Sequence, residues 1–152
     1  MSDLIKKIME LKTKRKAVIL VHNYQIPELY EVADFIGDSL DLSKKAAEAQ
    51  GEVIVFCGVH FMAETAAILN PGKTVLIPDK NSGCPMANMI HEKQLSEMKK
   101  EHPDAVVVTY VNSTAKIKAL SDICCTSANA LKVVSSIPLN KKIIFTGAEK
   151  DI

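Results

Sequence analysis

Polar side chains that can do chemistry follow the apolar runs of this sequence. The segment 22–25, His-Asn-Tyr-Gln, comes directly after the apolar run 17–21, and the segment 110–114, Tyr-Val-Asn-Ser-Thr, comes after the run 105–109. Ligands of parallel α/β sheets bind beyond the carboxyl ends of the strands. Backbone N–H groups at helix starts favour carboxylate or phosphate at such places. These segments therefore indicate a site for a small polyanionic substrate.

Individual members of these segments have more than one interpretation. His22 titrates near neutrality and can serve as a general acid, a general base or a donor to a carboxylate. It can equally be a histidine at a strand end that is bonded to a backbone carbonyl. Ser113 and Ser127 are residues of the type that caps helix N-termini, and capping is the alternative to ligand binding for both.

The cysteines offer metal chemistry without a complete site. Their positions are Cys57, Cys84, Cys124 and Cys125, and none forms a C-x-x-C pair, which disfavours a thiol-redox protein. Cys84 lies between a glycine and a proline in a predicted loop, where a thiolate can bind a metal or an iron–sulfur cluster. Cys57 and Cys124 fall on predicted strands, so we expect both to be buried. We therefore expect a thiol reagent to reach Cys84 first.

Composition excludes several other classes of protein. The 152 residues are 47% hydrophobic and 24% charged, which is typical of a globular protein. The 19 basic residues nearly balance the 18 acidic ones, so no nucleic-acid partner is expected. No apolar segment is long enough for a membrane span or a signal peptide, and we expect a cytoplasmic protein. A glycine-rich phosphate loop is also absent, which disfavours dinucleotide and ATP binding.

Short β-branched runs alternate with longer amphipathic segments, a pattern that predicts an α/β fold with parallel sheets covered by helices on both faces. The predicted strands are 17–21, 53–57, 74–77, 105–109, 122–125 and 142–145. The predicted helices are 2–14, 27–35, 42–49, 63–69, 87–100, 114–120 and 128–137.

A weak internal repeat indicates two similar units. The segments 17–25 and 105–113 are both apolar strands that run into a polar turn with an asparagine. A second strand follows from Glu52 and from Ser121, and a third follows near residues 73 and 141. We predict two three-layer αβα units, residues 1–80 and 81–152, with the second truncated at its C-terminal end. The alternative is two unrelated βαβ stretches.

Five sequence segments resemble one known family. In chain order they read H-N-Y-Q, G-D-S-L, F-M-A-E-T-A, Y-V-N-S and T-S-A-N, within a match that runs from about residue 16 to residue 152. Together they are similar to the N-terminal half of quinolinate synthase. That resemblance implies three pseudo-equivalent α/β domains around a central pocket, with a [4Fe–4S] cluster held by one cysteine from each domain.

The resemblance also implies roles for particular residues. Cys84 corresponds to the first of the three cluster ligands, the one that this chain contains. Tyr24 corresponds to a tyrosine that assists proton transfer, and His22 is its expected catalytic partner. The residues implied to bind iminoaspartate are His22, Ser39, Tyr110, Val111, Asn112 and Ser127. We expect an anion bound by these residues to lie between the two units.

The implied activity is a transferase reaction with dehydrating cyclisation: iminoaspartate and dihydroxyacetone phosphate condense to quinolinate in NAD biosynthesis. The family is roughly twice as long as this chain. We therefore expect the 152 residues alone to be incomplete and inactive and to hold no stable cluster. A fragment of a longer protein and assembly with another chain are both open explanations of this length. The expected protein partner is either the missing C-terminal part or the L-aspartate oxidase that supplies iminoaspartate. The alternative function is a non-catalytic α/β module that binds a small dicarboxylate or phosphate.

Overall fold

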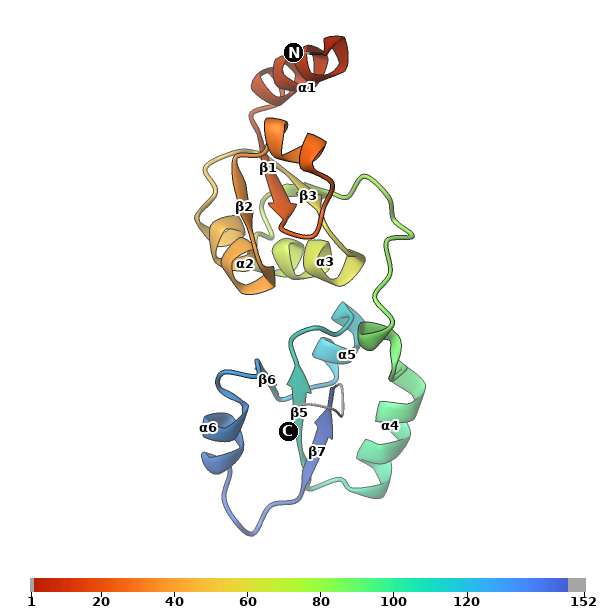
Figure 1. Cartoon of the computed structure of the whole chain (residues 1–152). Helices are drawn as coiled ribbons and strands as arrows, with labels where there is room; N and C mark the ends of the chain where they lie inside the picture. The colour runs from red at the N-terminus through yellow and green to blue at the C-terminus, as the bar shows by residue number, and fades with distance from the viewer. Residues whose placement is uncertain (1, 148–152) are drawn as a thin grey trace. The chain divides into compact units, whose positions relative to one another are not determined.

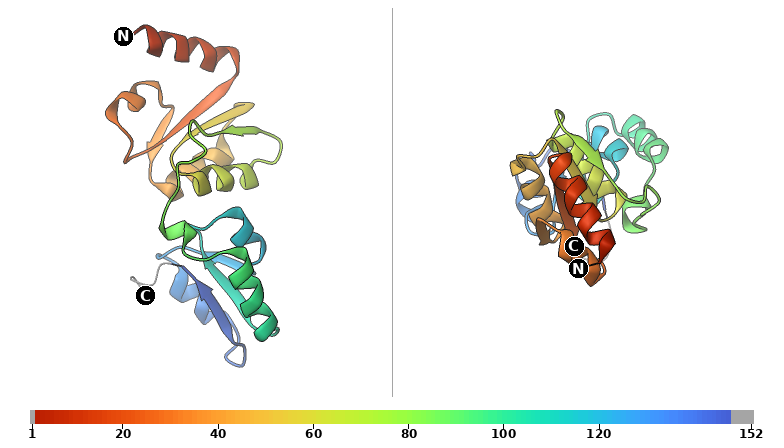
Figure 2. Two further views of the ribbon diagram at one scale, coloured as in Figure 1. Left: turned by 90° about the vertical axis from the view of Figure 1, so that its right-hand side faces the viewer. Right: turned by 90° about the horizontal axis from the view of Figure 1, so that it is seen from above.

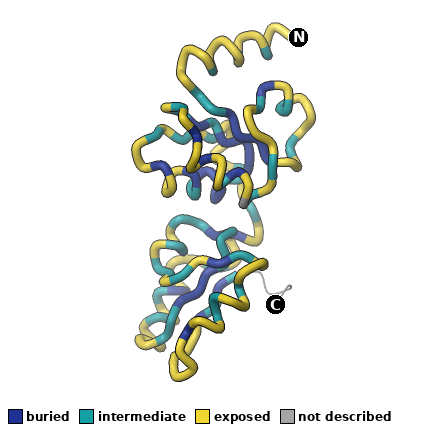
Figure 3. Tube along the Cα trace, turned by 90° about the vertical axis from the view of Figure 1, so that its left-hand side faces the viewer, coloured by how far each residue is buried: buried dark blue, intermediate teal, exposed yellow. Residues whose placement is uncertain are grey.

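The computed structural model describes residues 2–147, without the side chain of Leu40 (Figure 1). The chain divides into two compact units, Met1–Ser82 and Gly83–Ile152. Within the described residues, no helix combines the length and the apolar character needed to cross a membrane. In each unit the buried residues follow the central strands (Figure 3).

The first unit is a parallel sheet of four strands in the order β2-β1-β3-β4. Its strands are β1 (Ala17–His22), β2 (Phe35–Gly37), β3 (Val53–Cys57) and β4 (Thr74–Leu76). Its helices are α1 (Asp3–Lys14), the 3-10 helix η1 (Pro27–Val32), α2 (Ser39–Glu48) and α3 (His60–Leu69).

Helices cover both faces of this sheet. On one face, Ile19 and Val21 of β1 pack with Val32 of η1 and with Ile5 and Ile8 of α1. Helices α2 and α3 contact each other and the sheet, and α3 lies on the side opposite to α1 (Figure 2). Alternate residues of a strand point to opposite faces, so the apolar run of β1 supplies both layers of the core.

The second unit is a parallel sheet of three strands in the order β6-β5-β7. Its strands are β5 (Val106–Tyr110), β6 (Ile123–Cys125) and β7 (Ile143–Thr146). Its helices are the 3-10 helix η2 (Met86–Asn88), α4 (Glu92–Glu101), α5 (Ala115–Ala119) and α6 (Ala130–Ser135). Val107 packs with Leu95 of α4 and Ile117 of α5, whereas Val108 packs with Cys125 and Ile137 beside α6. The two sheets confirm the predicted α/β class with short parallel strands.

Two of the predicted helices do not form as single helices. Residues 27–35 do not form one helix, because η1 ends at Val32 and Ala33 is extended, with φ −67° and ψ 140°. The chain then forms β2, which hydrogen-bonds to β1, so tertiary pairing overrides the local pattern. Residues 87–100 are likewise divided into η2 and α4, and His91, the N-cap residue of α4, donates its backbone N–H to the side-chain oxygen of Gln94 at 2.9 Å.

The strands also correct the proposed repeat. Strand β2 pairs with β1 through Leu20 and Phe35, and β6 pairs with β5 through Val108 and Ile123. The strand after Ser121 is therefore equivalent to β2, and not to the strand after Glu52. Strand β3 lies on the other side of β1, as β7 lies on the other side of β5. The sequence interpretation did not predict β2, and for this reason it aligned the strands of the two units wrongly.

Candidate functional site

His22 and Ser39 lie together in the first unit. His22 is the last residue of β1 and is 7% exposed. Ser39 begins α2, directly after the neighbouring strand β2, and its Oγ lies 3.5 Å from Nε2 of His22. The Sδ atom of Met62 is 4.0 Å from the same Oγ. A hydroxyl and an imidazole thus meet at the carboxyl end of the sheet.

The surroundings of His22 fix which form of the imidazole is present. The backbone N–H of Tyr24 donates to Nδ1 at 3.4 Å, and the two rings are in contact with centroids 3.9 Å apart and planes tilted by 35°. Burial lowers the pKa of His22, and the Asp38 carboxylate opposes that shift more weakly. The neutral ring with its proton on Nε2 satisfies these contacts, so His22 can donate toward Ser39 or a ligand. Its Nδ1 accepts a backbone N–H, so this atom does not make the carbonyl bond of the alternative interpretation.

Tyr110 and Ser127 form the corresponding pair in the second unit. Tyr110 ends β5, and the Oγ of Ser127 donates to its phenol oxygen at 3.2 Å. The N–H of Val111 donates to the carbonyl of Cys125 at 2.8 Å, which holds the turn against β6. Asn112 is half-buried in that turn. A phenol and a hydroxyl therefore occupy the strand end where the first unit has an imidazole and a hydroxyl.

The alternative of helix capping is wrong for both serines. The hydroxyl of Ser113 donates to the carbonyl of Tyr110 at 2.8 Å, and the cap of α5 is Thr114, whose Oγ1 accepts from Ile117. Residue 129, not Ser127, is the N-cap position of α6. Ser127 is thus free of the structural role that its residue type favours.

Asp38 is a residue of this region that the sequence interpretation missed. Its Oδ1 accepts the N–H of Asp41 at 2.9 Å in the first turn of α2, and its negative charge acts on His22. The signal was an aspartate directly before a helix, the usual position of a cap. It went unnoticed because the helix was predicted to begin only at Leu42.

The cysteine predictions were partly wrong. Cys57 is buried as expected, and burial raises the pKa of its thiol. Cys124 is exposed instead, and the buried residue of the adjacent pair is Cys125. Strand β6 lies at the edge of its sheet, and Cys125 faces Val108 and Ile137 whereas Cys124 points to the other side. Cys84 is half-buried, and its carbonyl accepts the N–H of Asn88 at 3.2 Å.

We expect a thiol reagent at neutral pH to modify Cys124 faster than any other cysteine of the native chain, with Cys84 next. Burial raises the pKa of Cys57 and of Cys125. Both thiols are therefore less accessible to the reagent and less often present as the reactive thiolate. Time-resolved labelling followed by peptide mass spectrometry measures the order. A Cys124→Ser variant should lose the fastest phase alone, and labelling of Cys57 at the rate of Cys124 would contradict the assignment.

Across residues 2–147, no three side chains of His, Cys, Asp or Glu are grouped to hold a metal ion. Cys84 has the accessibility and the loop position that a single thiolate ligand requires. Among the described residues, Cys84 is therefore suited to be one ligand of an iron–sulfur cluster.

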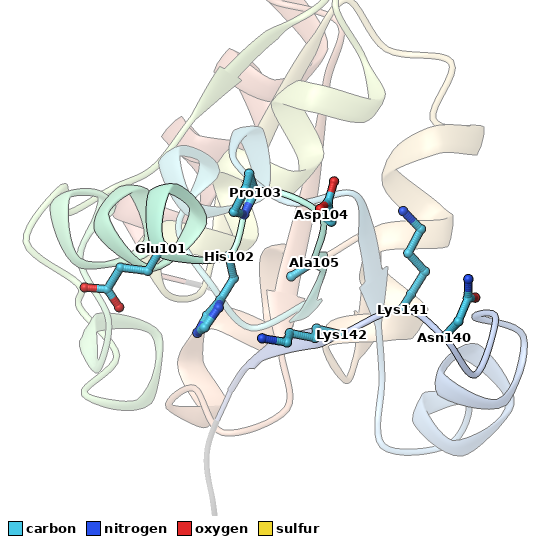
Figure 4. Close-up of a pocket in the computed structure, with 8 residues that line it drawn as sticks. All are labelled: Glu101, His102, Pro103, Asp104, Ala105, Asn140, Lys141 and Lys142. Atoms are coloured by element: carbon cyan, nitrogen blue, oxygen red, sulfur yellow. The ribbon is translucent and has the colours of Figure 1, made fainter.

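Cavities occur away from these strand ends. One, of about 340 Å³, lies at the amino end of β5 and β7 (Figure 4). It is lined by Glu101, His102, Pro103, Asp104, Ala105, Asn140, Lys141 and Lys142. A larger one, of about 740 Å³, is lined mainly by aliphatic residues of α1, β1, β3 and β4 and includes Cys57. Neither contains any of the residues predicted to bind substrate.

The fold and the polar strand ends define an α/β protein whose paired ring and hydroxyl donors suit a small anionic ligand. The family model described as Quinolinate synthetase A protein matches residues 6–150, and the chain belongs to that family. The chain is 66% identical over 131 residues to a quinolinate synthase of Dehalococcoides mccartyi, a match that covers 86% of this chain and 43% of that protein.

Two further relatives extend the comparison. The quinolinate synthase of Desulforudis audaxviator is 58% identical over 143 residues, which are 94% of this chain and 47% of that protein. The quinolinate synthase of Thermus thermophilus is 56% identical over 142 residues, which are 93% of this chain and 46% of that protein. The chain thus spans less than half the length of these relatives, in agreement with the predicted N-terminal half.

Proposed function

We propose that this chain supplies the first part of a quinolinate synthase, which condenses iminoaspartate with dihydroxyacetone phosphate to form quinolinate, phosphate and two molecules of water for NAD biosynthesis. The observation that supports the proposal best is the pairing of a ring donor with a serine in both units, His22 with Ser39 and Tyr110 with Ser127. Membership of the quinolinate synthase family supports iminoaspartate, a dicarboxylate, as the ligand of these donors.

The donors suit iminoaspartate because they direct several hydrogen bonds without adding net charge. The proposed contacts are His22, Ser39, Tyr110, Val111, Asn112 and Ser127. A neutral imidazole, a phenol and hydroxyls can each donate to a carboxylate oxygen, and the absence of a lysine or arginine among them favours later release of product. Backbone N–H groups at the start of α2 add a favourable dipole beside Ser39.

Tyr24 is the proposed residue for proton transfer. Its ring contacts the ring of His22, with the two planes tilted by 35°, so the phenol lies beside the proposed carboxylate donors. A phenol in that position can give a proton to, or accept one from, the triose-derived part of the substrate during isomerisation. Cys84 is the proposed ligand of a [4Fe–4S] cluster, which when bound supplies a Lewis acid to substrate oxygen. The remaining ligands are proposed to come from the second half of the family's length.

The proposal is tested by completing the chain. The segment that follows the matched region in the Thermus thermophilus relative is fused to this chain at the end of its own matched region. Iron and sulfide are then reconstituted without oxygen, and quinolinate is assayed from the two substrates. We expect quinolinate to form and the fusion to support growth of a bacterium that lacks its own quinolinate synthase. Binding of a dicarboxylate without turnover by a cluster-loaded fusion would favour the alternative, a non-catalytic binding module. Delivery of iminoaspartate by L-aspartate oxidase is a proposed partnership that the same assay can include.

A further inference from the structure

An aspartate makes the same pair of backbone hydrogen bonds in both units. In the first unit, Oδ2 of Asp34 accepts the N–H of Ile19 at 2.8 Å, and the N–H of Asp34 donates to the carbonyl of Ile19 at 2.9 Å. In the second unit, Asp122 makes both bonds to Val107, also at 2.8 and 2.9 Å. The partners are 15 residues apart in each case. We call each pair of bonds an aspartate clasp.

Each aspartate clasp lies next to a very short strand. Asp34 directly precedes β2 and Asp122 directly precedes β6, and each of these edge strands has three residues. A parallel pairing over three residues has few inter-strand hydrogen bonds. A shift of the strand by one residue therefore costs little, and the register is only weakly specified by the pairing itself. At the far end of each strand pair there is one further bond, from the N–H of Asn23 to Gly37 and from the N–H of Val111 to Cys125.

The register of these strands decides where the serines lie. Ser39 follows Asp34 by the same number of residues as Ser127 follows Asp122, and each ring-bearing residue is 17 positions before its serine. A slip of one residue moves a strand by about 3.3 Å and reverses its faces. That movement exceeds the tolerance of contacts at 3.5 and 3.2 Å between the serine oxygens and the rings.

We propose that Asp34 and Asp122 are positioning residues, whose clasps fix the register of β2 and β6 and thereby bring Ser39 to His22 and Ser127 to Tyr110. In each unit, a lysine of the helix that precedes the central strand, α1 before β1 and α4 before β5, supports the clasp. Lys12 binds Oδ1 of Asp34 at 2.6 Å, and the Lys99 ammonium donates to the carbonyl two residues before Asp122 at 2.6 Å. Among residues 2–147, only the clasp of Asp34 has an ion pair, the one with Lys12. The feature that both units share is therefore the pair of backbone hydrogen bonds. The value of this positioning for catalysis rests on the proposed function.

The two units serve as controls for each other in amide hydrogen exchange. In the 152-residue chain, Asp34→Ala should speed exchange at the Asn23 amide by about tenfold and leave the Val111 amide unchanged. Asp122→Ala should do the opposite. The Asn variants retain an oxygen that accepts the strand N–H, so Asp34→Asn and Asp122→Asn should restore slow exchange at the affected amide. Asp104→Ala, at an exposed loop position, should change neither.

Several results would overturn the positioning role. Unchanged exchange at Asn23 in Asp34→Ala would show that the clasp does not hold β2 in place. Uniform acceleration of every amide in the unit would show an ordinary loss of stability instead. Failure of both Asn variants to rescue exchange would exclude the backbone bond as the cause. If Asp34→Ala does not fold, Asp122→Ala provides the same comparison in the other unit.

Kinetics of the completed enzyme separate this inference from the proposed function. Asp34→Ala should raise the KM for iminoaspartate by about tenfold with a smaller change in kcat, and Asp34→Asn should restore it. A changed exchange rate at Asn23 with an unchanged KM would leave the positioning role intact and would contradict substrate binding by His22 and Ser39.

Discussion

Replacing Cys84 by alanine in the completed enzyme is expected to abolish iron–sulfur cluster binding while the α/β fold persists. A thiolate ligand contributes both a metal bond and a negative charge, and the methyl group of alanine provides neither. Cys84 is half-buried in a loop and belongs to none of the described hydrophobic clusters, so its loss should cost little packing. Iron content and visible absorbance after anaerobic reconstitution measure cluster binding, and circular dichroism measures the fold.

Cys124 provides the matched control for this experiment. It is an exposed cysteine of the same unit, so Cys124→Ala should retain the iron content of the unaltered protein. Iron retained at full stoichiometry in Cys84→Ala would contradict the assignment of this ligand. Loss of iron in both variants would instead show that cysteine replacement in this unit perturbs the site indirectly.

The strands with long apolar runs were predictable because their sequence alone requires burial on both faces. The run of β1 was located to within one residue and β3 was located exactly as the structure has it. Strand β2 was not predictable in this way. Its residues Phe35, Ile36 and Gly37 have no extended run of their own, and they form a strand only because β1 offers them a partner.

The candidate site was predictable only where its residues lie on strands with long apolar runs. His22 and Tyr110 could be assigned to strand ends because their strands are strongly patterned. The contacts of Ser39 and Ser127 with those rings depend on edge-strand register, which is a tertiary property. The exposure of Cys124 has the same origin, since an apolar run does not reveal which face of an edge strand a helix will cover.

Replacing Asn112 by alanine in the completed enzyme is expected to raise the iminoaspartate concentration needed for half-maximal rate by roughly tenfold to a hundredfold. Asn112 is half-buried in the turn between Val111, whose N–H is bonded to β6, and Ser113, whose hydroxyl is bonded to Tyr110. Those bonds hold the backbone of the turn, so the substitution should remove the amide without moving its neighbours. One hydrogen bond to a carboxylate contributes about 1.5–3 kcal/mol.

The cluster absorbance of Asn112→Ala should equal that of the unaltered enzyme, because the substitution leaves the Cys84 ligand in place. Asn140→Ala is the matched control, since Asn140 is an exposed asparagine of the same unit at the cavity on the amino side of the sheet. It should leave the substrate dependence unchanged. An unchanged substrate dependence in Asn112→Ala would show that the role taken from the family is wrong at this position. The turn from Tyr110 to Ser113 would then serve only to place Thr114 as the cap of α5.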